Sequence, residues 1–481
     1  MLFSSYVYVL AFLPTAIAGF FIVGRRFGSP EARTWLLACS LVFYGWWDYR
    51  FLPLLIGAAG ANYLLGRRLA QAPSGALLTA GVCGNLALLG FFKYADFLIV
   101  NLNTASGAGL PLLGLILPLG ISFHTFQNIA YLVDCNRERR CEASFQDYVL
   151  FLSFFPHAIA GPIVHHREMI PQFAVAARSG ADWERISAGA FLFFIGLFKK
   201  VIVADNLSVW AADGFSQAAG LSFIEAWTAA LAYTFQLYFD FSGYTDMAIG
   251  AAAMLNIRLP VNFLSPYKAR NIQEFWRRWH ITLSRFLREY VYIPLGGNAG
   301  GRSRTLVNLL LTFLIGGIWH GAGWNFAIWG LLHGVALVAH RLWSWGGLRM
   351  PAPVGWLLTF LFVVVAWVFF RSPDFTSAIQ MLTAMAGANG VVLPLALERI
   401  LPAIDGVSYS VYWLEKIQWE TGKYAPFVLP ACLAVVLAAP NSIELFERFR
   451  PSPRRGWWLA AMASLALCWL HREAEFLYYQ F

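Results

Sequence analysis

Charged residues are scarce in this sequence. Asp, Glu, Lys and Arg make up 13% of its 481 residues, whereas soluble domains carry about 25%. Hydrophobic residues account for 59%, and the mean hydropathy is +0.58. This balance excludes an ordinary soluble globular domain. Acidic residues are fewer than basic ones, with 26 Asp and Glu against 35 Lys and Arg, so the formal net charge is +9.

Several motifs of familiar enzyme chemistry are absent as well. The chain has no Ser/His/Asp order, HExxH, CxxC, GxGxxG or P-loop, no nucleic-acid-binding motif and no repeat of 20–50 residues. Its six cysteines are scattered, and only Cys135 and Cys141 lie close together. A C-x5-C pair without further ligands is a poor zinc signal. We therefore predict no metal site and assign the cysteines no function.

Long apolar runs dominate instead. A helix that crosses a membrane needs about 20 mostly apolar residues, and the chain has runs enough for ten to twelve such helices. Residues 305–340 contain no Lys, Arg, Asp or Glu and are long enough for two helices, while residues 146–164 could form a re-entrant segment. We predict an all-α, polytopic integral membrane protein. The candidate runs are 5–24, 34–48, 51–66, 76–99, 111–133, 185–203, 222–253, 305–340, 355–370, 427–440 and 457–470.

Basic loops indicate the orientation of the chain, because Lys and Arg stay on the cytoplasmic side. Loops 25–33, 67–74 and 135–142 are basic and segment 258–304 is net +7, whereas loop 387–426 is net −1. Both termini are therefore predicted outside the cytoplasm. No Lys or Arg precedes the first apolar run, as a cleavable signal peptide would require. The positive net charge follows from this topology, so we predict no nucleic-acid partner.

The chain is interpreted as a single membrane domain, 1–481, with a cytoplasmic amphipathic segment, 258–304, and an outer loop, 387–426. Within the first, residues 271–297 read "NIQEFWRRWHITLSRFLREYVYIPLGG" and predict one amphipathic helix at the membrane interface. Its arginines either lie among solvent and lipid headgroups or bind an anionic substrate from the cytosol. The apolar positions are Phe275, Trp279, Leu283, Phe286 and Leu287, and the basic ones are Arg277, Arg278, Arg285 and Arg288.

One imidazole lies inside the uncharged run, in "GGIWHGAGWNFAIWGLLHG" at residues 316–334. An ionisable side chain at membrane depth usually faces a cavity or a partner, so His320 is either a general base or a hydrogen-bonded packing residue in a tight helix crossing. The flanking glycines allow close backbone approach or a helix break. Trp319 and Trp324 are candidate walls of a cavity. On one straight helix, His333 would lie about 220° away from His320, so the two would not share a face.

His280 precedes His320 by forty residues and lies in the basic amphipathic segment. By itself it is typical of an interfacial histidine, but the two together suggest histidines that approach one cavity from different sides. Asp240 and Asp246, in or beside an apolar helix, could pair with Lys199 or Lys200, and we favour a structural role for them.

Six stretches of this sequence resemble the membrane-bound O-acyltransferase family, in its bacterial alginate O-acetylation and D-alanyl-transfer branch. The closing "FLYYQF" at 476–481 fits the same branch. The stretches occur in order over much of the chain. They are "GISFHTFQNIAYLVD" (120–134), "LSFFPHAIAGPI" (152–163), "YFDFSGYTDMAIG" (238–250), "NFLSPYKARNIQEFWRRWHITLSRFLREYVYIPLGG" (262–297), the segment around His320 (316–334) and "WVFFR" (367–371).

The resemblance implies a catalytic role for His320, the histidine of the family's WHG motif, and maps the second polar catalytic position to His280. It implies a ring of helices around a funnel in a bacterial inner membrane, with both termini periplasmic. An acyl thioester, acetyl-coenzyme A or a similar donor, would enter from the cytoplasm, with no bound cofactor. Its phosphates would lie near Arg277 and Arg278. The further candidate substrate-binding residues are Trp319, Trp324 and Asn325.

The expected activity is transfer of an acetyl group to a hydroxyl of an alginate-like exopolysaccharide or to a periplasmic acetyltransferase or carrier protein. The tail "EFLYYQF" could dock at the outer mouth of the funnel, contact that partner, or form part of an interfacial aromatic belt. Two rival interpretations remain open. One is a sister enzyme that moves D-alanine to teichoic acid, and the other is a secondary transporter, which would also place polar residues and broken helices at membrane depth.

Overall fold

The computed structural model describes residues 1–401, 405–471 and 477, and almost all the regular structure in them is helical. The predicted all-α class is therefore confirmed. The described chain divides into two compact units, each built from distant parts of the sequence. Unit 1 comprises Met1–Phe198, Gly243–Asn262 and Ser442–Glu473, and unit 2 comprises Lys199–Ser242, Phe263–Asn441 and Ala474–Phe481. The interpretation of residues 1–481 as a single domain stays a prediction.

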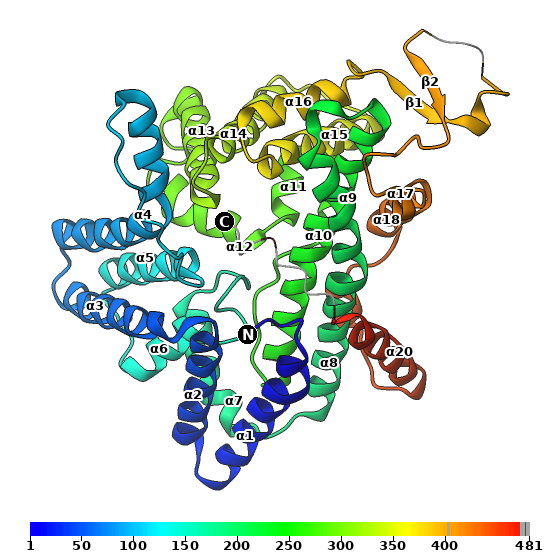
Figure 1. Ribbon diagram of the computed structural model, residues 1–481. Helices are drawn as coiled ribbons and strands as arrows, with labels where there is room; N and C mark the ends of the chain where they lie inside the picture. Colours follow the sequence, from blue (N-terminus) through cyan, green and yellow to red (C-terminus); the bar gives the residue numbers. More distant parts are fainter. Residues whose placement is uncertain (402–404, 472–476, 478–481) are drawn as a thin grey trace. The chain divides into compact units, whose positions relative to one another are not determined.

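Unit 1 is a set of helices that includes the end of the long helix α10, Phe223–Met254 (Figure 1). Its other α-helices are α1 (Leu13–Arg26), α2 (Ser29–Asp48), α3 (Leu52–Gln71), α4 (Gly75–Ser106), α5 (Ile121–Glu138), α6 (Phe145–Ser153), α7 (His166–Arg178), α8 (Trp183–Phe198), α19 (Ser442–Glu447) and α20 (Pro453–Trp469), with short turns η1 (Val7–Phe12) and η2 (Tyr49–Phe51).

Unit 2 contains the first part of α10, the helix α9 that precedes it and the helices from α11 to α18. They are α9 (Asp205–Ser216), α11 (Ile272–Arg278), α12 (Ile281–Leu287), α13 (Gly301–His320), α14 (Trp324–Trp345), α15 (Ala352–Arg371), α16 (Phe375–Met385), α17 (Trp419–Gly422) and α18 (Ala425–Ala438), with short turns η3 (Lys199–Ala204), η4 (Ala218–Gly220), η5 (Pro266–Lys268), η6 (Arg288–Tyr292) and η7 (Leu395–Leu397).

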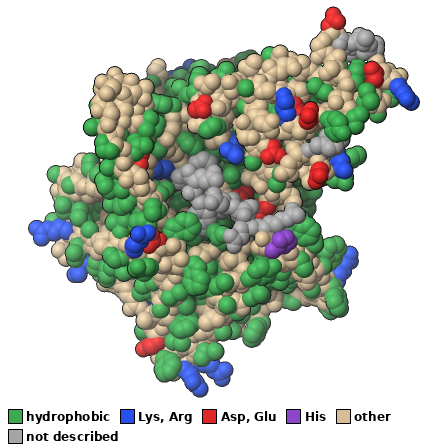
Figure 2. Space-filling model, in the orientation of Figure 1, with side chains coloured by type: hydrophobic (Ala, Val, Ile, Leu, Met, Phe, Trp, Pro, Cys, Tyr) green, Lys and Arg blue, Asp and Glu red, His purple; other side chains and the backbone are tan. Residues whose placement is uncertain are grey.

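Five helical stretches of the described chain are long and apolar enough to cross a membrane. On the face drawn in Figure 2, hydrophobic side chains are abundant and charged ones are isolated. A polytopic membrane protein is therefore confirmed, while the number of ten to twelve helices stays a prediction. The five stretches are Val7–Arg26, Gly75–Ser106, Trp183–Ser216, Trp324–Trp345 and Ala352–Arg371.

Glycines bring α8 and α10 into backbone contact within unit 1. A Cβ atom on Gly189 would lie 2.6 Å from the backbone oxygen of Gly250, and a Cβ on Gly250 would lie 2.5 Å from that of Gly189. Small residues at such crossings are typical of membrane proteins, where lipid removes most of the hydrophobic drive between helices and close packing replaces it.

A charged cluster joins α5 to the start of α7 in unit 1. The His166 ring nitrogens lie 2.7 Å from Glu142 Oε1 and 3.4 Å from Asp134 Oδ2, and Arg167 lies 3.3 Å from the same Asp134 oxygen. Burial alone would lower the pKa of His166, but the hydrogen bonds and charges of Asp134 and Glu142 outweigh it, so the pKa is raised above 6.5.

This raised pKa predicts that stability depends on pH. A group whose pKa is higher in the folded state stabilises the protein fully below its unfolded pKa, and that stabilisation is lost as the pH rises through the folded pKa. We expect thermal unfolding of the detergent-solubilised protein to lose more stability between pH 6 and pH 9 than the His166→Gln variant does. Parallel pH curves for the two proteins would contradict this assignment.

The predicted amphipathic helix over 271–297 is not continuous. It forms two short helices, α11 and α12, and the π-helical turn η6. The break lies at Trp279, which is extended at φ −102° and ψ 130°, and His280, which is left-handed at φ 42° and ψ 54°. The expectation of one helix was wrong. The helical spacing of apolar residues continues on both sides of the bend, so the spacing does not reveal the left-handed residue between the two helices.

The predicted outer loop, 387–426, contains the only strands in the described chain. β1 (Val391–Pro394) and β2 (Val407–Ser410) pair in parallel, with Val391 opposite Val407 and Pro394 opposite Ser410. The two strands belong to unit 2 (Figure 1).

Candidate active site

The uncharged run 305–340 forms a helical hairpin. α13 ends at His320, residues 321–323 turn the chain, and α14 begins at Trp324; the two helices lie side by side (Figure 1). A Cβ on Gly317 would lie 2.8 Å from Gly330 Cα, so the backbones touch directly. The 220° estimate for one straight helix therefore does not apply, because α13 ends at His320 and His333 lies on α14.

This close approach predicts that no side chain fits at the crossing. We expect Gly317→Ala to destabilise the protein by about 1–3 kcal/mol, the usual cost of overpacking, as measured by thermal unfolding in detergent. Gly84→Ala is the matched control, because a Cβ at Gly84 in α4 would meet nothing within 4 Å and alanine favours a helix by about 1 kcal/mol. Equal unfolding temperatures for the two variants would show that α13 and α14 can separate freely.

Aromatic rings surround His320, which is 4% exposed. Its ring centroid lies 4.9 Å from those of Trp319 and Trp329 and 5.3 Å from that of Phe370, with interplanar angles of 67°, 87° and 75°. These edge-to-face contacts fix the plane of the imidazole. Trp319 packs against the imidazole, and its role as a cavity wall stays a prediction.

A second histidine, His333, joins the same aromatic group. Its ring lies 4.8 Å from that of Trp329, and its Nδ1 accepts a hydrogen bond of 3.2 Å from Trp276 Nε1. Trp276 also lies 5.8 Å from Trp329. The sequence analysis did not include His333 among the candidate site residues. The glycine-rich sequence after His320 is the signal that could have predicted a turn there, and such a turn places His333 beside the His320 segment.

His280 lies in the bend between α11 and α12 and is fully buried. Its ring is 4.9 Å from Phe241 and nearly perpendicular to it, at 86°. Burial lowers the pKa of His280 to about 3, so the imidazole is neutral at physiological pH. A left-handed conformation is costly for a residue with a Cβ and is often found at functional sites.

A series of ring contacts connects the surroundings of His280 with those of His320. Phe241 packs on Phe263 at 4.9 Å, Phe263 on Trp279 at 5.1 Å, and Trp279 on Trp367 at 5.1 Å. Trp367 then stacks on Trp329, the neighbour of His320, at 5.7 Å. Both predicted histidines therefore belong to one buried aromatic cluster in unit 2.

A cavity of about 680 Å³ lies beside this cluster, within unit 2. Three arginines line it, Arg277, Arg288 and Arg341, and no Asp or Glu is among the described residues that do so. Trp276 forms part of its wall and contacts Trp329, which contacts His320. A basic cavity thus lies two indole rings away from the buried imidazole.

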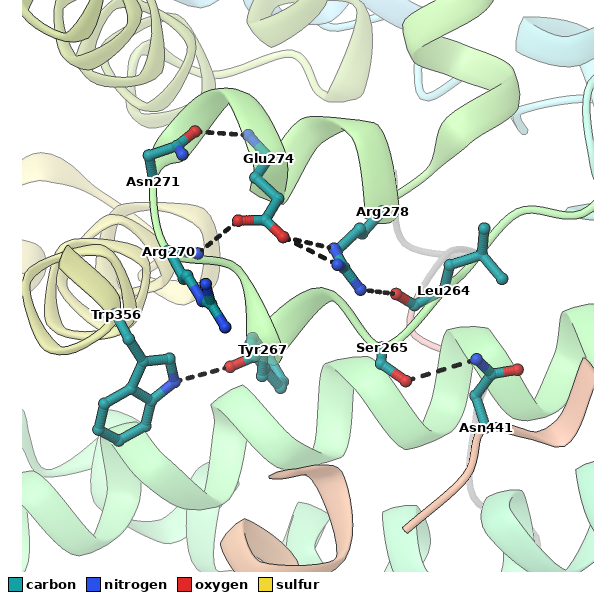
Figure 3. Close-up of polar contacts among 9 residues, drawn as sticks. All are labelled: Leu264, Ser265, Tyr267, Arg270, Asn271, Glu274, Arg278, Trp356 and Asn441. Atoms are coloured by element: carbon teal, nitrogen blue, oxygen red, sulfur yellow. Dashed lines mark hydrogen bonds and ion pairs between the residues drawn. The ribbon is translucent and has the colours of Figure 1, made fainter. Parts of the chain in front are cut away.

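The two arginines predicted to hold phosphates have different surroundings. Arg277 lines the cavity, but Arg278 pairs with Glu274 at 2.8 Å and donates to the backbone oxygen of Leu264 at 3.2 Å (Figure 3). Sequence reasoning did not single out Arg288 or Arg341 as substrate-binding residues. Arg341 is contributed by α14, and spacing along the amphipathic segment gives no sign of it.

The remaining candidates lie at the start of α14. Trp324 is 63% exposed, whereas Asn325 is 4% exposed and its Nδ2 donates to the backbone oxygen of Ser372 at 2.9 Å. Asn325 therefore ties the start of α14 to the end of α15.

A buried ion cluster lies elsewhere in unit 2. Lys200 Nζ is 2.7 Å from Asp205 Oδ1 and 2.9 Å from Asp240 Oδ1. The suggested pairing of Asp240 with a neighbouring lysine is confirmed, and the other Asp240 oxygen accepts the backbone N–H of Leu477 at 3.1 Å. Of the tail "EFLYYQF", residues 475, 476 and 478–481 lie outside the described residues.

A polytopic membrane protein that buries an imidazole beside a basic cavity has the features of a membrane-bound acyl-transfer enzyme. Residues 121–372, just over half of the chain, match the model of MBOAT, the membrane-bound O-acyltransferase family. The chain therefore belongs to this family and is an integral membrane O-acyltransferase.

Three relatives of this chain have names that describe different acyl-transfer activities. A peptidoglycan O-acetyltransferase of Helicobacter pylori is 43% identical over 100% of this chain and 98% of its own. A probable alginate O-acetylase of Pseudomonas aeruginosa is 40% identical over 80% of this chain and 75% of its own. A teichoic acid D-alanyltransferase of Bacillus subtilis is 25% identical over 76% of this chain and 95% of its own.

Proposed function

We propose that this enzyme moves an acetyl group from a cytosolic thioester, acetyl-coenzyme A, to a hydroxyl of a cell-envelope glycan or its periplasmic carrier protein, with His320 as the catalytic base. The observation that carries this proposal is the buried His320 ring, two indoles away from a cavity lined by three arginines. The enzyme spans the bacterial inner membrane with both termini on the periplasmic side. Membership of an acyltransferase family sets aside the secondary transporter.

The donor is held by its phosphates. Guanidinium groups form charge-assisted, often bidentate hydrogen bonds to phosphate oxygens, and Arg277, Arg288 and Arg341 converge on one cavity of about 680 Å³. A cavity of that volume is within the usual range for small-molecule sites. The acetyl end of the donor then extends past Trp276 and Trp329 towards His320.

The transfer step uses neutral imidazole. His320 removes the proton from the acceptor hydroxyl as its oxygen attacks the thioester carbonyl, the carbon–sulfur bond breaks, and the imidazolium returns the proton to the leaving thiolate. General base action of this kind contributes about 10²- to 10⁴-fold to the rate. His280, kept neutral by burial, orients the thioester or donates to the developing oxyanion.

The comparisons favour peptidoglycan over alginate as the glycan that finally receives the acetyl group. The relative named as a peptidoglycan O-acetyltransferase aligns with 100% of this chain, while the probable alginate O-acetylases align with 80%. Teichoic acid D-alanyltransferases of Streptococcus thermophilus and Bacillus subtilis are 26% and 25% identical to this chain, so D-alanyl transfer is the less favoured alternative.

The proposed function is tested with purified protein in lipid nanodiscs and with cells that lack the gene. We expect the protein to release thiol from acetyl-coenzyme A when a glycan or carrier acceptor is present. Deletion should remove the base-labile acetate from purified peptidoglycan and leave that of exopolysaccharide unchanged. Loss of acetate from exopolysaccharide alone would show that exopolysaccharide, and not peptidoglycan, is the acceptor. Transfer of D-alanine without transfer of acetate would contradict acetyl-coenzyme A as the donor.

The donor site makes a separate prediction. We expect Arg277→Gln to raise KM for acetyl-coenzyme A about 10- to 100-fold, because a hydrogen bond to a charged group contributes about 1.5–3 kcal/mol, with a small effect on kcat. Arg278→Gln is the matched comparison, since its guanidinium already pairs with Glu274. Equal increases in KM for both variants would place the donor outside this cavity.

A further inference from the structure

A second cavity, of about 590 Å³, is lined by α14, α15 and the start of α11, all in unit 2. Apolar side chains form most of its wall, among them Ala339 and Trp343 from α14 and Leu358 and Phe362 from α15. Both helices are among the stretches that are long and apolar enough to cross a membrane. Trp343 and Leu358 are 41% and 52% exposed, so the groove opens onto the surface that lipid would cover.

The groove is polar at one end. Arg270, His340 and Ser344 line it near the loop that joins α14 to α15, while Ala336 and Phe362 lie further along the two helices. Ser344 lies eight positions after Ala336, a rise of about 12 Å along the helix. This length is close to half of the roughly 30 Å hydrocarbon thickness of a bilayer, so the groove matches a single leaflet.

The backbone of Arg270 is fixed, and its side chain is exposed. Its backbone N–H donates to Glu274 Oε2 at 2.9 Å, and a Cβ on Gly355 would lie 2.6 Å from its backbone oxygen. Trp356 Nε1 also donates to the backbone oxygen of Tyr267 at 2.9 Å, which holds this segment against α15 (Figure 3). Within the part of the chain that the structure describes, the Arg270 guanidinium has no ion pair or hydrogen bond.

Charge complementarity identifies the kind of ligand. The described residues that line the groove include Arg270 but no Asp or Glu. An exposed cation above an apolar channel one leaflet long suits an amphiphile with an anionic head and a hydrocarbon tail. We propose that this groove binds one anionic phospholipid, with its phosphate at Arg270 and one acyl chain along α14 and α15. The groove shares His340 with the proposed donor cavity, but Arg270 lines only the groove and Arg277 only that cavity. The lipid proposal does not depend on the proposed acetyl transfer.

The proposal is tested by native mass spectrometry and thermal unfolding of the full-length protein in detergent. The probes are dioleoylphosphatidylglycerol, dioleoylphosphatidylcholine and glycerol 3-phosphate. We expect phosphatidylglycerol to remain bound and to raise the unfolding temperature more than phosphatidylcholine does, and glycerol 3-phosphate alone to have no effect. Arg270→Gln should weaken phosphatidylglycerol binding about tenfold and leave phosphatidylcholine binding unchanged.

Two further variants complete the design. Arg25→Gln removes the same charge from an exposed position in α1 and should behave as wild type. Ala339→Phe fills the exposed apolar channel and should weaken the binding of both lipids. The proposal is overturned if Arg270→Gln and Arg25→Gln bind phosphatidylglycerol equally, or if glycerol 3-phosphate binds as well as the lipid. It is also overturned if Ala339→Phe leaves lipid binding unchanged and instead lowers the mass of the protein particle, which would show that a second copy of the chain covers the groove. Arg270→Gln changes only an exposed side chain, so its result decides the matter even if Ala339→Phe fails to fold.

Discussion

Replacing His320 with alanine lowers kcat for acetyl transfer by at least about 10²- to 10⁴-fold, the usual contribution of a general base. The loss arises because none of the three rings in contact with His320 can take the acceptor proton in its place: Trp319, Trp329 and Phe370 carry no basic nitrogen. The measurement is initial-rate release of thiol from acetyl-coenzyme A with acceptor present. Donor KM should change little, since the arginines proposed to hold the phosphates remain in place.

Two controls separate chemistry from folding. His320→Gln keeps a polar side chain of similar size without a base, and it should be as inactive as the alanine variant. His471→Ala removes an exposed histidine and should retain wild-type turnover. A folded His320→Ala protein with normal kcat would remove this residue from the mechanism and leave His280 and His333 as the imidazoles to test.

Replacing Lys200 with methionine destabilises the protein by about 3–5 kcal/mol, the typical cost of breaking a buried ion pair by removing one partner. The side chains of Lys200, Asp205 and Asp240 are 4%, 9% and 2% exposed, so the substitution leaves two carboxylates buried without their cation. The measurement is chemical or thermal unfolding in detergent micelles.

A second variant tests whether the stability lost in Lys200→Met is regained when the two carboxylates are removed as well. A triple variant that also carries Asp205→Leu and Asp240→Leu removes the whole cluster, and such replacements are often neutral or stabilising. We therefore expect the triple variant to regain most of the lost stability. Lys423→Met, at an exposed cation that lies 5.3 Å from the Tyr424 ring centroid, should change stability by under about 1 kcal/mol. A single Lys200→Met variant as stable as wild type would show that water already reaches this cluster.

The class of the protein could be predicted from the sequence because membrane insertion depends on composition over long windows. The uncharged run 305–340 predicted two helices, and α13 and α14 occupy it. The environment of His320 was also accessible, since Trp319 is adjacent in the chain and the surrounding glycines predict close packing. These inferences depend only on residues that are close together in the sequence.

Other features of the site depend on contacts between distant segments. The bend at His280 could not be predicted, because apolar spacing continues through it on both sides. Trp276 and His333 are separated by 57 residues, yet they share a hydrogen bond. Arg341 lines the cavity of about 680 Å³ from α14, outside the amphipathic segment that contains Arg277. Each of these contacts forms only when the fold brings two helices together, and the hydropathy of the sequence does not predict which helices pair.

The indole pair between the cavity and His320 has a consequence for the resting enzyme. Trp276 forms part of the cavity wall and Trp329 packs edge-on against the imidazole. Under the proposed function, a thioester that reaches His320 has to displace at least one of these rings. The same two rings would then keep bulk water from the imidazole in the resting enzyme and limit wasteful hydrolysis of the donor.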